Sequence, residues 1–330
     1  MTTLITGAAG FIGFHTAKAL LAKGVEVVGI DNLNDYYDPA LKRARLSHFD
    51  GEKGFAFHHA DLADMQALRD AVAGRKIDRI IHLAAQAGVR YSLQNPHAYV
   101  QSNLVGHVNM LELARHMGGL EHMAYASSSS IYGGRTDLPF RESDRADTPV
   151  SLYAATKKSN ELMSHTYAHL YGIPLTGLRF FTVYGPWGRP DMAYWSFTDR
   201  ILKGETIEVF NHGDMLRDFT FIDDIVDGVL RISERGFVPA GQGEGGSGAP
   251  HAVYNIGNNH PERLEDFVAI LERLTGRKAN RRDLPMQPGD VPATYADIAA
   301  IRRDYGFEPT TSLEEGLRRF VTWYRQYFGV

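Results

Sequence analysis

A glycine-rich turn near the start of the chain limits the fold more than any other stretch. Gly7-Ala8-Ala9-Gly10-Phe11-Ile12-Gly13 follows a short apolar run, Leu4 to Thr6, and leads into an apolar-periodic segment that extends to about Lys23. Gly7 permits a tight turn, Gly10 lets the backbone approach a pyrophosphate, and Gly13 lets a helix pack closely on a strand. A strand from Val25 to Ile30, ended by Asp31, completes the order strand, turn, helix, strand. This order is the dinucleotide-binding pattern, in which the helix N-terminus faces the phosphates.

Asp31 indicates which dinucleotide is bound. Its carboxylate would accept hydrogen bonds from both ribose hydroxyls and would repel a 2′-phosphate, and no arginine follows until Arg43. We therefore expect NAD rather than NADP. The alternative is a glycine-rich turn without a ligand, which the strand, helix and acid around it disfavour.

Strands and helices continue to alternate as far as Phe181. Apolar strands are predicted at 55–60, 79–85, 122–127 and 175–181, and one of the helices between them spans about His97 to His116. This alternation predicts an α/β fold, a doubly wound, Rossmann-type parallel sheet with helices on both faces. Ligands then bind at the carboxyl ends of the strands. The residues that fall at those ends are Gly10, Asp31, Asp61, Ala84 and Ser128.

A change in this pattern after residue 181 predicts two domains. Residues 1–181 are expected to form an NAD-binding domain, and residues 182–330 mainly a smaller α/β domain that binds the substrate. A helix near 218–236 and a strand near 252–258 are expected to return to the first domain, and two amphipathic helices to close the chain. Residues 236–250 are rich in glycine and are predicted to form a flexible surface loop.

The composition narrows the class of partner. The chain has 330 residues, a net charge of −4 and no cysteine. Because no basic block stands out, nucleic acid is not expected as a partner, and the lack of cysteine excludes disulfides and thiolate metal sites. The 14 histidines have no metal-ligand spacing, so no metal site is predicted. No apolar run reaches the ~18 residues of a membrane span and no signal peptide is evident, so we expect a cytoplasmic protein.

A tyrosine and a lysine four residues apart indicate the chemistry. Tyr153 and Lys157 fall in a segment with helical spacing, about Ser151 to Leu170, so both side chains should point into the same space. A lysine cation lowers the pKa of a nearby phenol, and such a tyrosine can act as a general base on a sugar hydroxyl. The alternative is an ordinary surface helix that contains both residues by chance. Asn160 and Glu161, further along, are expected only to be solvated or to cap the helix.

Hydroxyl groups gather where the predicted strand 122–127 ends, in Ser127-Ser128-Ser129-Ser130-Ile131-Tyr132-Gly133. Hydroxyls at a strand end can bind a substrate oxygen and relay a proton. The alternative is a polar turn capped by serines, which is common.

Together these motifs resemble those of the extended short-chain dehydrogenase/reductase superfamily, and within it the nucleotide-sugar epimerases and dehydratases, over nearly the whole chain. The resemblance rests on the glycine turn, the serine-rich strand end, Tyr153 with Lys157, and Arg217-Asp218-Phe219. It implies that Tyr153 is the catalytic base, that Lys157 binds the nicotinamide ribose and tunes Tyr153, and that Arg217 grips the nucleotide diphosphate. Ser128 would match the catalytic serine or threonine, with Ser129 and Ser130 beside it. The NAD-binding residues that it implies are Gly7, Gly10, Phe11, Ile12, Gly13, Asp31, Asn32, Asp61, Leu62, Leu83, Ala84, Ala85, Asn103, Tyr153 and Lys157.

Ser129 and Ser130 discriminate between activities within that family. The 4,6-dehydratases have Asp and Glu just after the catalytic Ser or Thr, and UDP-glucuronate decarboxylases have Glu there. Epimerisation at C4 needs no second acid or base, because one tyrosine removes the O4 proton and later returns it. NAD takes and returns the C4 hydride, and the 4-keto sugar rotates between the two steps.

The stretch from Thr182 to Arg189 resembles the loop of UDP-glucuronate 4-epimerases, in which Thr and Arg face the sugar carboxylate. A planar guanidinium suits a carboxylate, although Arg189 could also be a solvated or ion-paired loop arginine. The 4-keto form of a uronic acid is a β-keto acid that can lose carbon dioxide, so Thr182 and Arg189 would hold the carboxylate away from the reactive alignment. The substrate-binding residues implied in all are Arg90, Ser128, Thr182, Arg189, Arg217 and Asp290.

The leading hypothesis is therefore C4 epimerisation of UDP-glucuronate to UDP-galacturonate with tightly held NAD. Three alternatives stay open: a UDP-glucose/UDP-galactose 4-epimerase, a net NAD-dependent sugar-nucleotide oxidoreductase, and a non-catalytic sugar-nucleotide-binding protein. The resemblance also implies a homodimer, formed through the helix of Tyr153 and the long helix before it. Apolar residues beyond one face of these helices are Leu104, Val108, Leu111, Leu162 and Tyr167.

Overall fold

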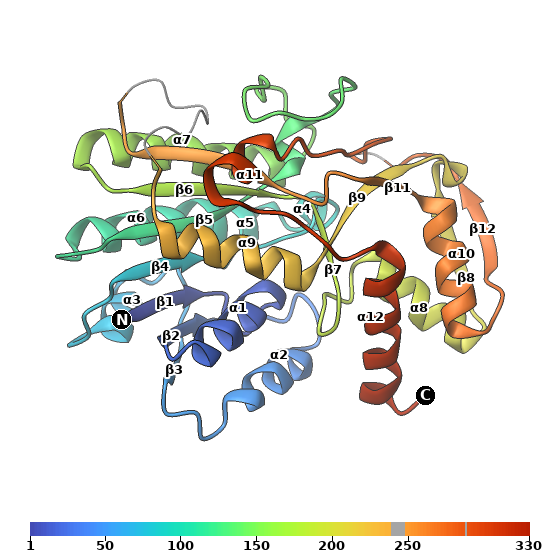
Figure 1. Cartoon of the computed structure of the whole chain (residues 1–330), viewed down its shortest axis with the longest axis horizontal. Helices are drawn as coiled ribbons and strands as arrows, with labels where there is room; N and C mark the ends of the chain where they lie inside the picture. Colours follow the sequence, from blue (N-terminus) through green and yellow to red (C-terminus); the bar gives the residue numbers. More distant parts are fainter. Residues whose placement is uncertain (239–247, 288) are drawn as a thin grey trace.

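A seven-stranded sheet forms the centre of the molecule in the computed structural model, which describes residues 1–238, 248–287 and 289–330 (Figure 1). The strand order is β10-β6-β5-β4-β1-β2-β3, and every neighbouring pair is parallel. The predicted Rossmann-type α/β class is confirmed. The order reverses between β1 and β4, which is where such sheets bind ligands. The strands are β1 (Thr2–Thr6), β2 (Glu26–Asp31), β3 (Phe55–His59), β4 (Arg79–His82), β5 (His122–Ser128), β6 (Leu175–Phe180) and β10 (His251–Ile256).

Helices cover both faces of this sheet. α1 (Phe11–Ala22) and α9 (Ile222–Arg235) pack together on one face, whereas α3 (Met65–Val72), α6 (Gly106–His116) and α7 (Leu152–Tyr171) lie on the other. Successive side chains of β5 alternate between the two cores, as the pleat of a strand requires. Leu111 is fully buried in the core under α6. Its predicted place at a subunit interface is therefore wrong, because the helix turns this residue toward its own sheet.

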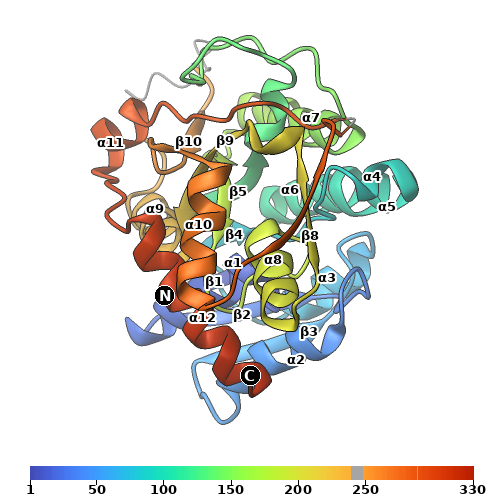
Figure 2. The same ribbon diagram turned by 90° about the vertical axis from the view of Figure 1, so that its right-hand side faces the viewer.

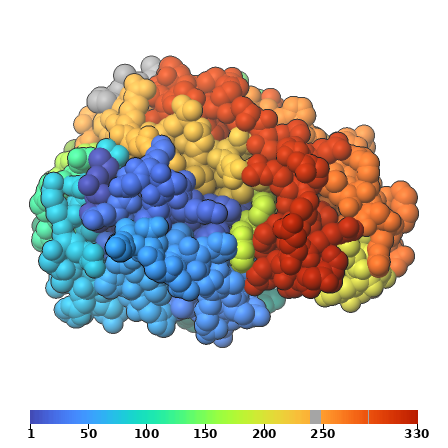
Figure 3. All heavy atoms as spheres, turned by 60° about the horizontal axis from the view of Figure 1, so that its bottom comes forward, coloured from blue at the N-terminus to red at the C-terminus, as the bar shows by residue number. Residues whose placement is uncertain are grey.

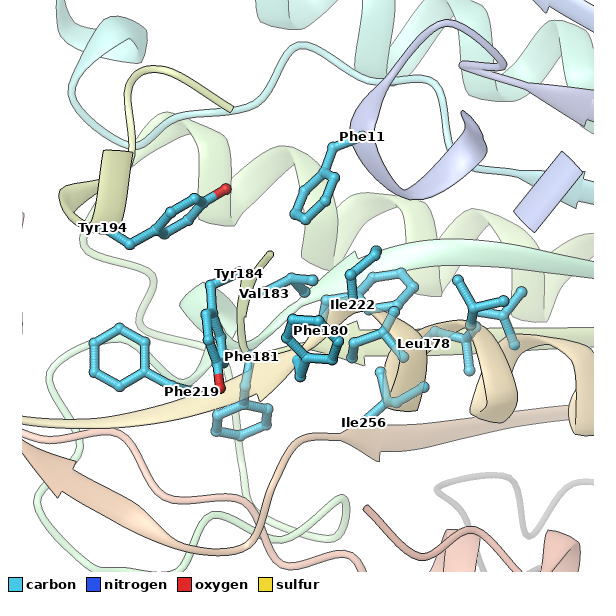
Figure 4. Packing of buried hydrophobic residues seen from close by; sticks show 14 of the residues in the cluster. Phe11, Leu178, Phe180, Phe181, Val183, Tyr184, Tyr194, Phe219, Ile222 and Ile256 are labelled. Carbon is cyan, nitrogen blue, oxygen red and sulfur yellow. The ribbon is translucent and has the colours of Figure 1, made fainter. Parts of the chain in front are cut away.

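A smaller assembly of strands and helices lies at one end of the large sheet, at the right in Figure 1 and facing the viewer in Figure 2. β7 (Thr182–Tyr184), β9 (Leu216–Phe221) and β11 (Pro261–Arg263) make a three-stranded sheet, and β8 (Thr206–Phe210) pairs with β12 (Asn280–Leu284). The helices of this part are α8 (Ala193–Lys203), α10 (Leu264–Thr275) and α12 (Leu313–Phe328). Figure 4 shows Leu178 and Ile256 of the large sheet in one cluster with Tyr184 and Phe219 of the small one. A single apolar core therefore continues from one sheet into the other.

Trp187 connects the last helix to the N-terminal part of the chain. Its ring lies 5.1 Å from that of Trp323 in α12 and 5.9 Å from that of Phe14 in α1, measured between centroids. In Figure 3 a yellow-green segment is visible between the blue N-terminal residues and the red C-terminal ones. These aromatic contacts fix the short segment between β7 and α8, which also contains Arg189.

Two predictions about the helices differ from the structure. In place of the single helix expected from His97 to His116, the structure has α5 (Pro96–Tyr99), a π-helical turn (Val100–Val105) and then α6. The π turn directs the Asn103 side chain inward. The chain closes with three helices rather than two, since α11 (Ala299–Tyr305) lies between α10 and α12. Of the loop predicted at 236–250, residues 239–247 lie outside the described residues. Within the described ranges, no helix has both the length and the apolarity needed to cross a bilayer.

Candidate active site

A cavity of about 710 Å³ opens at the carboxyl ends of the central strands. It has two walls. The strand-end wall consists of residues that follow β1, β2, β3 and β4, and the distal wall consists of Thr182, Arg189, Asp191, Arg217 and Asp290. Of the residues predicted from the sequence, those that line the cavity are Gly7, Gly10, Phe11, Ile12, Gly13, Asp31, Asn32, Asp61, Leu62, Leu83, Ala84, Ala85, Arg90, Ser128, Ser129, Ser130, Tyr153, Lys157, Thr182, Arg189, Arg217 and Asp290.

The glycine turn has the shape that a dinucleotide requires. Gly7 adopts a φ of 73°, and a Cβ atom there would lie 2.9 Å from the backbone nitrogen of Ala84. A Cβ atom on Gly13 would overlap the carbonyl oxygen of Gly7. α1 begins at Phe11, and because Phe11, Ile12 and Gly13 line the cavity, its free N–H groups and positive dipole end face it. No acidic residue in the first turn opposes this positive end. The turn therefore fits the pyrophosphate of NAD.

Asp31 is held in place by the backbone around it. Its Oδ2 accepts a hydrogen bond from the nitrogen of Ala9 at 3.1 Å, and its Oδ1 accepts one from the nitrogen of Leu33 at 2.9 Å. Each carboxylate oxygen can accept a second bond, so ribose hydroxyls can still be bound. The sequence analysis missed Lys42, a buried cavity residue whose Nζ donates to the Asn34 carbonyl at 2.7 Å. The preference for NAD rested on Arg43 as the first arginine after Asp31, whereas the lysine just before it, on α2 (Pro39–Leu46), is the cation that lines the cavity.

Tyr153 and Lys157 lie in the first turns of α7, as predicted, and both line the cavity. Ser151 caps this helix by accepting a hydrogen bond from the nitrogen of Ala154. The Lys157 Nζ donates to the carbonyl oxygen of Ala126 at 2.9 Å. Burial lowers the pKa of Lys157 to about 8, while the charge of Glu161 opposes this shift.

The prediction that Tyr153 has a lowered pKa is wrong for this structure. Burial raises the pKa of the Tyr153 phenol, and the charge of Asp191 adds to this. A hydrogen bond with Ser128 and the charge of Arg189 act in the opposite direction. Lys157 is directed at a backbone carbonyl, so the desolvation of the phenolate outweighs the expected stabilisation.

The three serines form a compact hydroxyl cluster where β5 ends. Ser128 donates from its Oγ to the Oγ of Ser130 at 3.1 Å and accepts from the backbone nitrogen of Ser130 at 3.2 Å. It thereby caps the short 3-10 helix Ser129–Tyr132. The same hydroxyl contacts Tyr153, so a sugar oxygen between them could be bound by one and deprotonated by the other.

Glu161 and Asn160 are buried, so the prediction that they are solvated or capping residues is wrong. Glu161 is 3% exposed and pairs with Arg179 of β6, which is fully buried, through N–O distances of 2.9 Å. Ser127 donates to the same carboxylate at 2.6 Å. These contacts fix α7, which contains Tyr153, against the ends of β5 and β6. Glu161 lies four residues after Lys157, so helical spacing places it on the same face as Tyr153 and Lys157. The spacing does not show that this part of the face packs on the sheet or that Arg179 neutralises the charge.

Asn103 does not line the cavity, in contrast to the other predicted residues. Its side chain accepts a hydrogen bond from the Gln86 nitrogen at 2.8 Å and donates one to the Gln86 carbonyl at 3.0 Å. It also donates to Thr156 of α7. Gln86 itself lines the cavity. Asn103 therefore fixes the segment after β4 from behind rather than reaching a ligand.

The distal wall contains two ion pairs. The guanidinium of Arg189 donates from Nε to Oδ1 of Asp191 at 3.0 Å and from Nη2 to Oδ2 at 2.5 Å. Arg217 donates from Nη2 to Oδ1 of Asp290 at 2.8 Å, and Arg90 approaches the other oxygen of that carboxylate at 3.9 Å. Two guanidinium groups around one carboxylate leave a net positive charge, which suits a diphosphate.

Arg45 connects the two walls from beneath the cavity. Arg45 is fully buried and makes five hydrogen bonds, four to backbone carbonyls and one to the phenol of Tyr37. Nη1 donates to the Ala9 carbonyl in the glycine turn at 2.8 Å, whereas Nε and Nη2 donate to the carbonyls of Trp187 and Gly188. The turn that faces a dinucleotide and the segment that contains Arg189 therefore depend on one side chain.

Comparison with known proteins agrees with this geometry. The chain is 49% identical to the protein named UDP-glucuronate 4-epimerase 4 of Arabidopsis thaliana, over 99% of this chain and 76% of that protein. The crystal structure of UDP-glucuronic acid 4-epimerase from Bacillus cereus, in complex with UDP-glucuronic acid and NAD, superposes with a TM-score of 0.88 at 33% identity and covers 99% of this chain and 100% of that one. The UDP-glucose 4-epimerase of Thermotoga maritima superposes with a TM-score of 0.87 at 28% identity and covers 99% and 100% of the two chains. Residues 3–257 match the family described as the NAD dependent epimerase/dehydratase family. The chain belongs to the NAD dependent epimerase/dehydratase family.

Proposed function

We propose that this protein is a UDP-glucuronate 4-epimerase that uses bound NAD and produces UDP-galacturonate without net oxidation. The strand-end wall would hold NAD, through the glycine turn and Asp31. The distal wall would hold the sugar nucleotide, with Arg217 at the diphosphate. In domain terms, the NAD-binding part would be residues 1–181 with β10 and α9, and the sugar-binding part would be the rest of residues 182–330.

In the proposed reaction, the residues of this chain move one proton and hold the sugar. Tyr153 removes the proton from O4 in its phenolate form, which the charge of Arg189 favours and burial disfavours. Ser128 donates a hydrogen bond to the same oxygen. Bound NAD supplies the acceptor, and later the donor, of the C4 hydride. The 4-keto sugar would have to turn over in the cavity, between the distal wall and Tyr153, so that its opposite face is presented. Tyr153 then gives the proton back to O4, which restores the enzyme.

A single observation supports the uronate as substrate: Arg189 lies in the same cavity as Tyr153, close enough to lower the pKa of that phenol. A guanidinium at this place can bind a carboxylate on C5 while C4 faces the base. The name of the half-identical plant relative supports the same substrate. A neutral hydroxymethyl group would make no comparable use of the charge.

Substitution of Arg189 by alanine tests this assignment. A charge-assisted contact in a partly dry site contributes about 1.5–3 kcal/mol, so Arg189→Ala should weaken UDP-glucuronate roughly 10–100-fold and UDP-glucose little. We expect carbon dioxide and a UDP-pentose as side products, because the carboxylate could then align for decarboxylation. Product analysis with both UDP-sugars, without added NAD, would measure both effects.

Arg189→Lys is the matched control, since it keeps the charge but loses the planar fork and should rescue only part of the binding. An equal loss on both sugars would make Arg189 structural and would favour a UDP-glucose 4-epimerase. Stoichiometric NADH formation would instead identify a net oxidoreductase. Binding of both sugars without turnover in the wild type would identify a non-catalytic binding protein.

The homodimer stays part of the proposal. Outward-facing apolar residues on the π turn and on α7 support it, because Val105, Leu162, Leu170 and Tyr171 are 37%, 60%, 60% and 42% exposed. Such a surface suits a second copy of the same two helices. Sedimentation at micromolar concentration should give a dimer, and Leu162→Asp should give a monomer. A wild-type monomer would refute this part.

The cytoplasmic location stays a prediction, which cell fractionation would test.

A further inference from the structure

Arg189 is already bound to a carboxylate within its own chain. Asp191 occupies the edge of the guanidinium formed by Nε and Nη2. The hydroxyl of Tyr36, which follows β2, donates to Oδ2 of Asp191 at 3.1 Å from the other side of the cavity. All three side chains line the cavity, and those of Arg189 and Asp191 are 25% and 28% exposed. The pair is therefore built into the wall and is accessible to a ligand.

The electrostatic effect of the pair is mutual. Burial alone would raise the pKa of Asp191, but Arg189 and the Tyr36 hydroxyl hold it below its ordinary value. Asp191 in turn raises the pKa of Arg189. Both groups therefore remain charged, and the pair is neutral as a whole. A sugar carboxylate that approaches the remaining edge of the guanidinium, formed by Nη1 and Nη2, would meet the cation of Arg189 and the nearby anion of Asp191 together.

We propose that Asp191 competes with the sugar carboxylate for Arg189 and so limits how tightly the enzyme holds a uronate. This inference rests on the proposed function, because it assumes that Arg189 binds the substrate carboxylate. Asp191 is in this view a positioning and specificity-determining residue. Tyr36 anchors Asp191, so that the competing carboxylate stays beside Arg189 when the sugar is bound.

The proposed reaction gives such competition a purpose. The 4-keto sugar has to turn over before the hydride returns, and the contacts made in the first orientation have to be released. An unshared arginine in a partly dry site would hold the carboxylate strongly in that orientation. Tight binding of the ground state that is not matched in the transition state slows turnover. A second carboxylate on the same guanidinium weakens each contact and lets the sugar move.

Asp191→Asn tests the inference, since asparagine keeps one acceptor oxygen, which can accept from Nη2 of Arg189 and from Tyr36 as Oδ2 of Asp191 does, but removes the charge. We expect the Kd for UDP-glucuronate to fall about 10-fold and kcat to fall with it, because the anion that repels the substrate is lost. The Kd for UDP-glucose should stay within about 2-fold. Calorimetric titration in a Tyr153→Phe background would measure the Kd values without turnover, and thermal melts would verify folding.

Two controls keep the test specific. Asp191→Glu retains the charge beside Arg189, so it should not tighten UDP-glucuronate binding by more than about 2-fold. Asp35→Asn removes an exposed carboxylate that does not line the cavity and should change neither Kd. An unchanged or higher Kd for UDP-glucuronate in Asp191→Asn would overturn the inference, as would equal tightening of both sugars. A wild type that does not interconvert UDP-glucuronate and UDP-galacturonate would instead refute the proposed function.

Discussion

The two walls of the cavity are built in different ways. The strand-end wall comes from consecutive strands of one parallel sheet, and its residues occur in the sequence in the order in which the strands do. The distal wall is gathered from β7, the segment before α8, β9 and the stretch around Asp290, which are more than a hundred residues apart at the extremes. Asp191 balances the charge of Arg189 there, while Arg217 and Arg90 share Asp290 and leave a net positive charge. The strand-end wall instead uses backbone N–H groups and the carboxylates of Asp31 and Asp61. Repetition of one supersecondary unit makes the first wall predictable from spacing. Thr182, Arg189, Arg217 and Asp290 of the second wall were predicted through the family resemblance, and Asp191 was missed.

Tyr153 stands between the two walls, and its removal should have the largest effect. Tyr153→Phe deletes the base but leaves both binding walls intact. We expect turnover to fall about 10²–10⁴-fold, while NAD content and the Kd for UDP-glucuronate stay close to wild type. Near-normal turnover would show that another group removes the O4 proton.

Glu161→Ala should have the next largest effect, because it removes one partner of a buried ion pair behind the strand-end wall. The loss of such a partner costs about 3–5 kcal/mol of unfolding free energy. Glu315→Ala, which removes an exposed ion pair with Arg318 on α12, is the control and should leave the free energy of unfolding nearly unchanged. Denaturant titration would measure both variants. Equal, small losses would mean that the Glu161 pair is as weak as a surface pair.

Asp31→Ala should damage the strand-end wall alone. The loss of charge-assisted bonds to the ribose should weaken NAD about 10–100-fold and reduce discrimination against NADP. The Kd for UDP-glucuronate should not change in enzyme saturated with NAD. A wild type that binds NADP as tightly as NAD would contradict the role given to Asp31, and Lys42 would then be the residue to test.

Arg45→Lys is the variant that should affect both walls together. Lysine keeps the charge but cannot donate to Ala9, Trp187 and Gly188 at once, so both NAD and UDP-glucuronate should bind about 10-fold more weakly. Arg43→Lys, at an exposed position of the same helix, should leave both unchanged. If only one ligand is weakened, the two walls are independent and Arg45 does not couple them.

The sequence predicted what depends on local pattern. The glycine turn, the strands of the large sheet and the position of Tyr153 and Lys157 on one helix all follow from spacing of two, three or four residues, and the structure has them. What depends on tertiary packing was missed. The burial of Glu161 on α7 requires Arg179 from β6. The partner of Arg189 is Asp191, a carboxylate only two residues away that no spacing rule selects.

Two further corrections show the same difference between local pattern and tertiary surroundings. Asn103 was placed at the ligand through the family resemblance, but from its π turn it is directed to Gln86. The pKa of Tyr153 was predicted from the cation of Lys157, whereas burial of the phenol decides the direction of the pKa shift. Both corrections concern the surroundings of a residue rather than its identity.

The place of β10 at the edge of the large sheet has a consequence for synthesis of the chain on the ribosome. β10 pairs with β6, yet the chain forms the whole β7–β9 region before it returns. At about 5–20 residues per second, the roughly 70 residues between Phe180 and His251 take on the order of several seconds to be made. Throughout that interval β6 is a bare edge with unpaired N–H and C=O groups, open to pairing with other nascent chains. The β6 edge is therefore open to incorrect strand pairing before the chain is complete and able to bind a ligand.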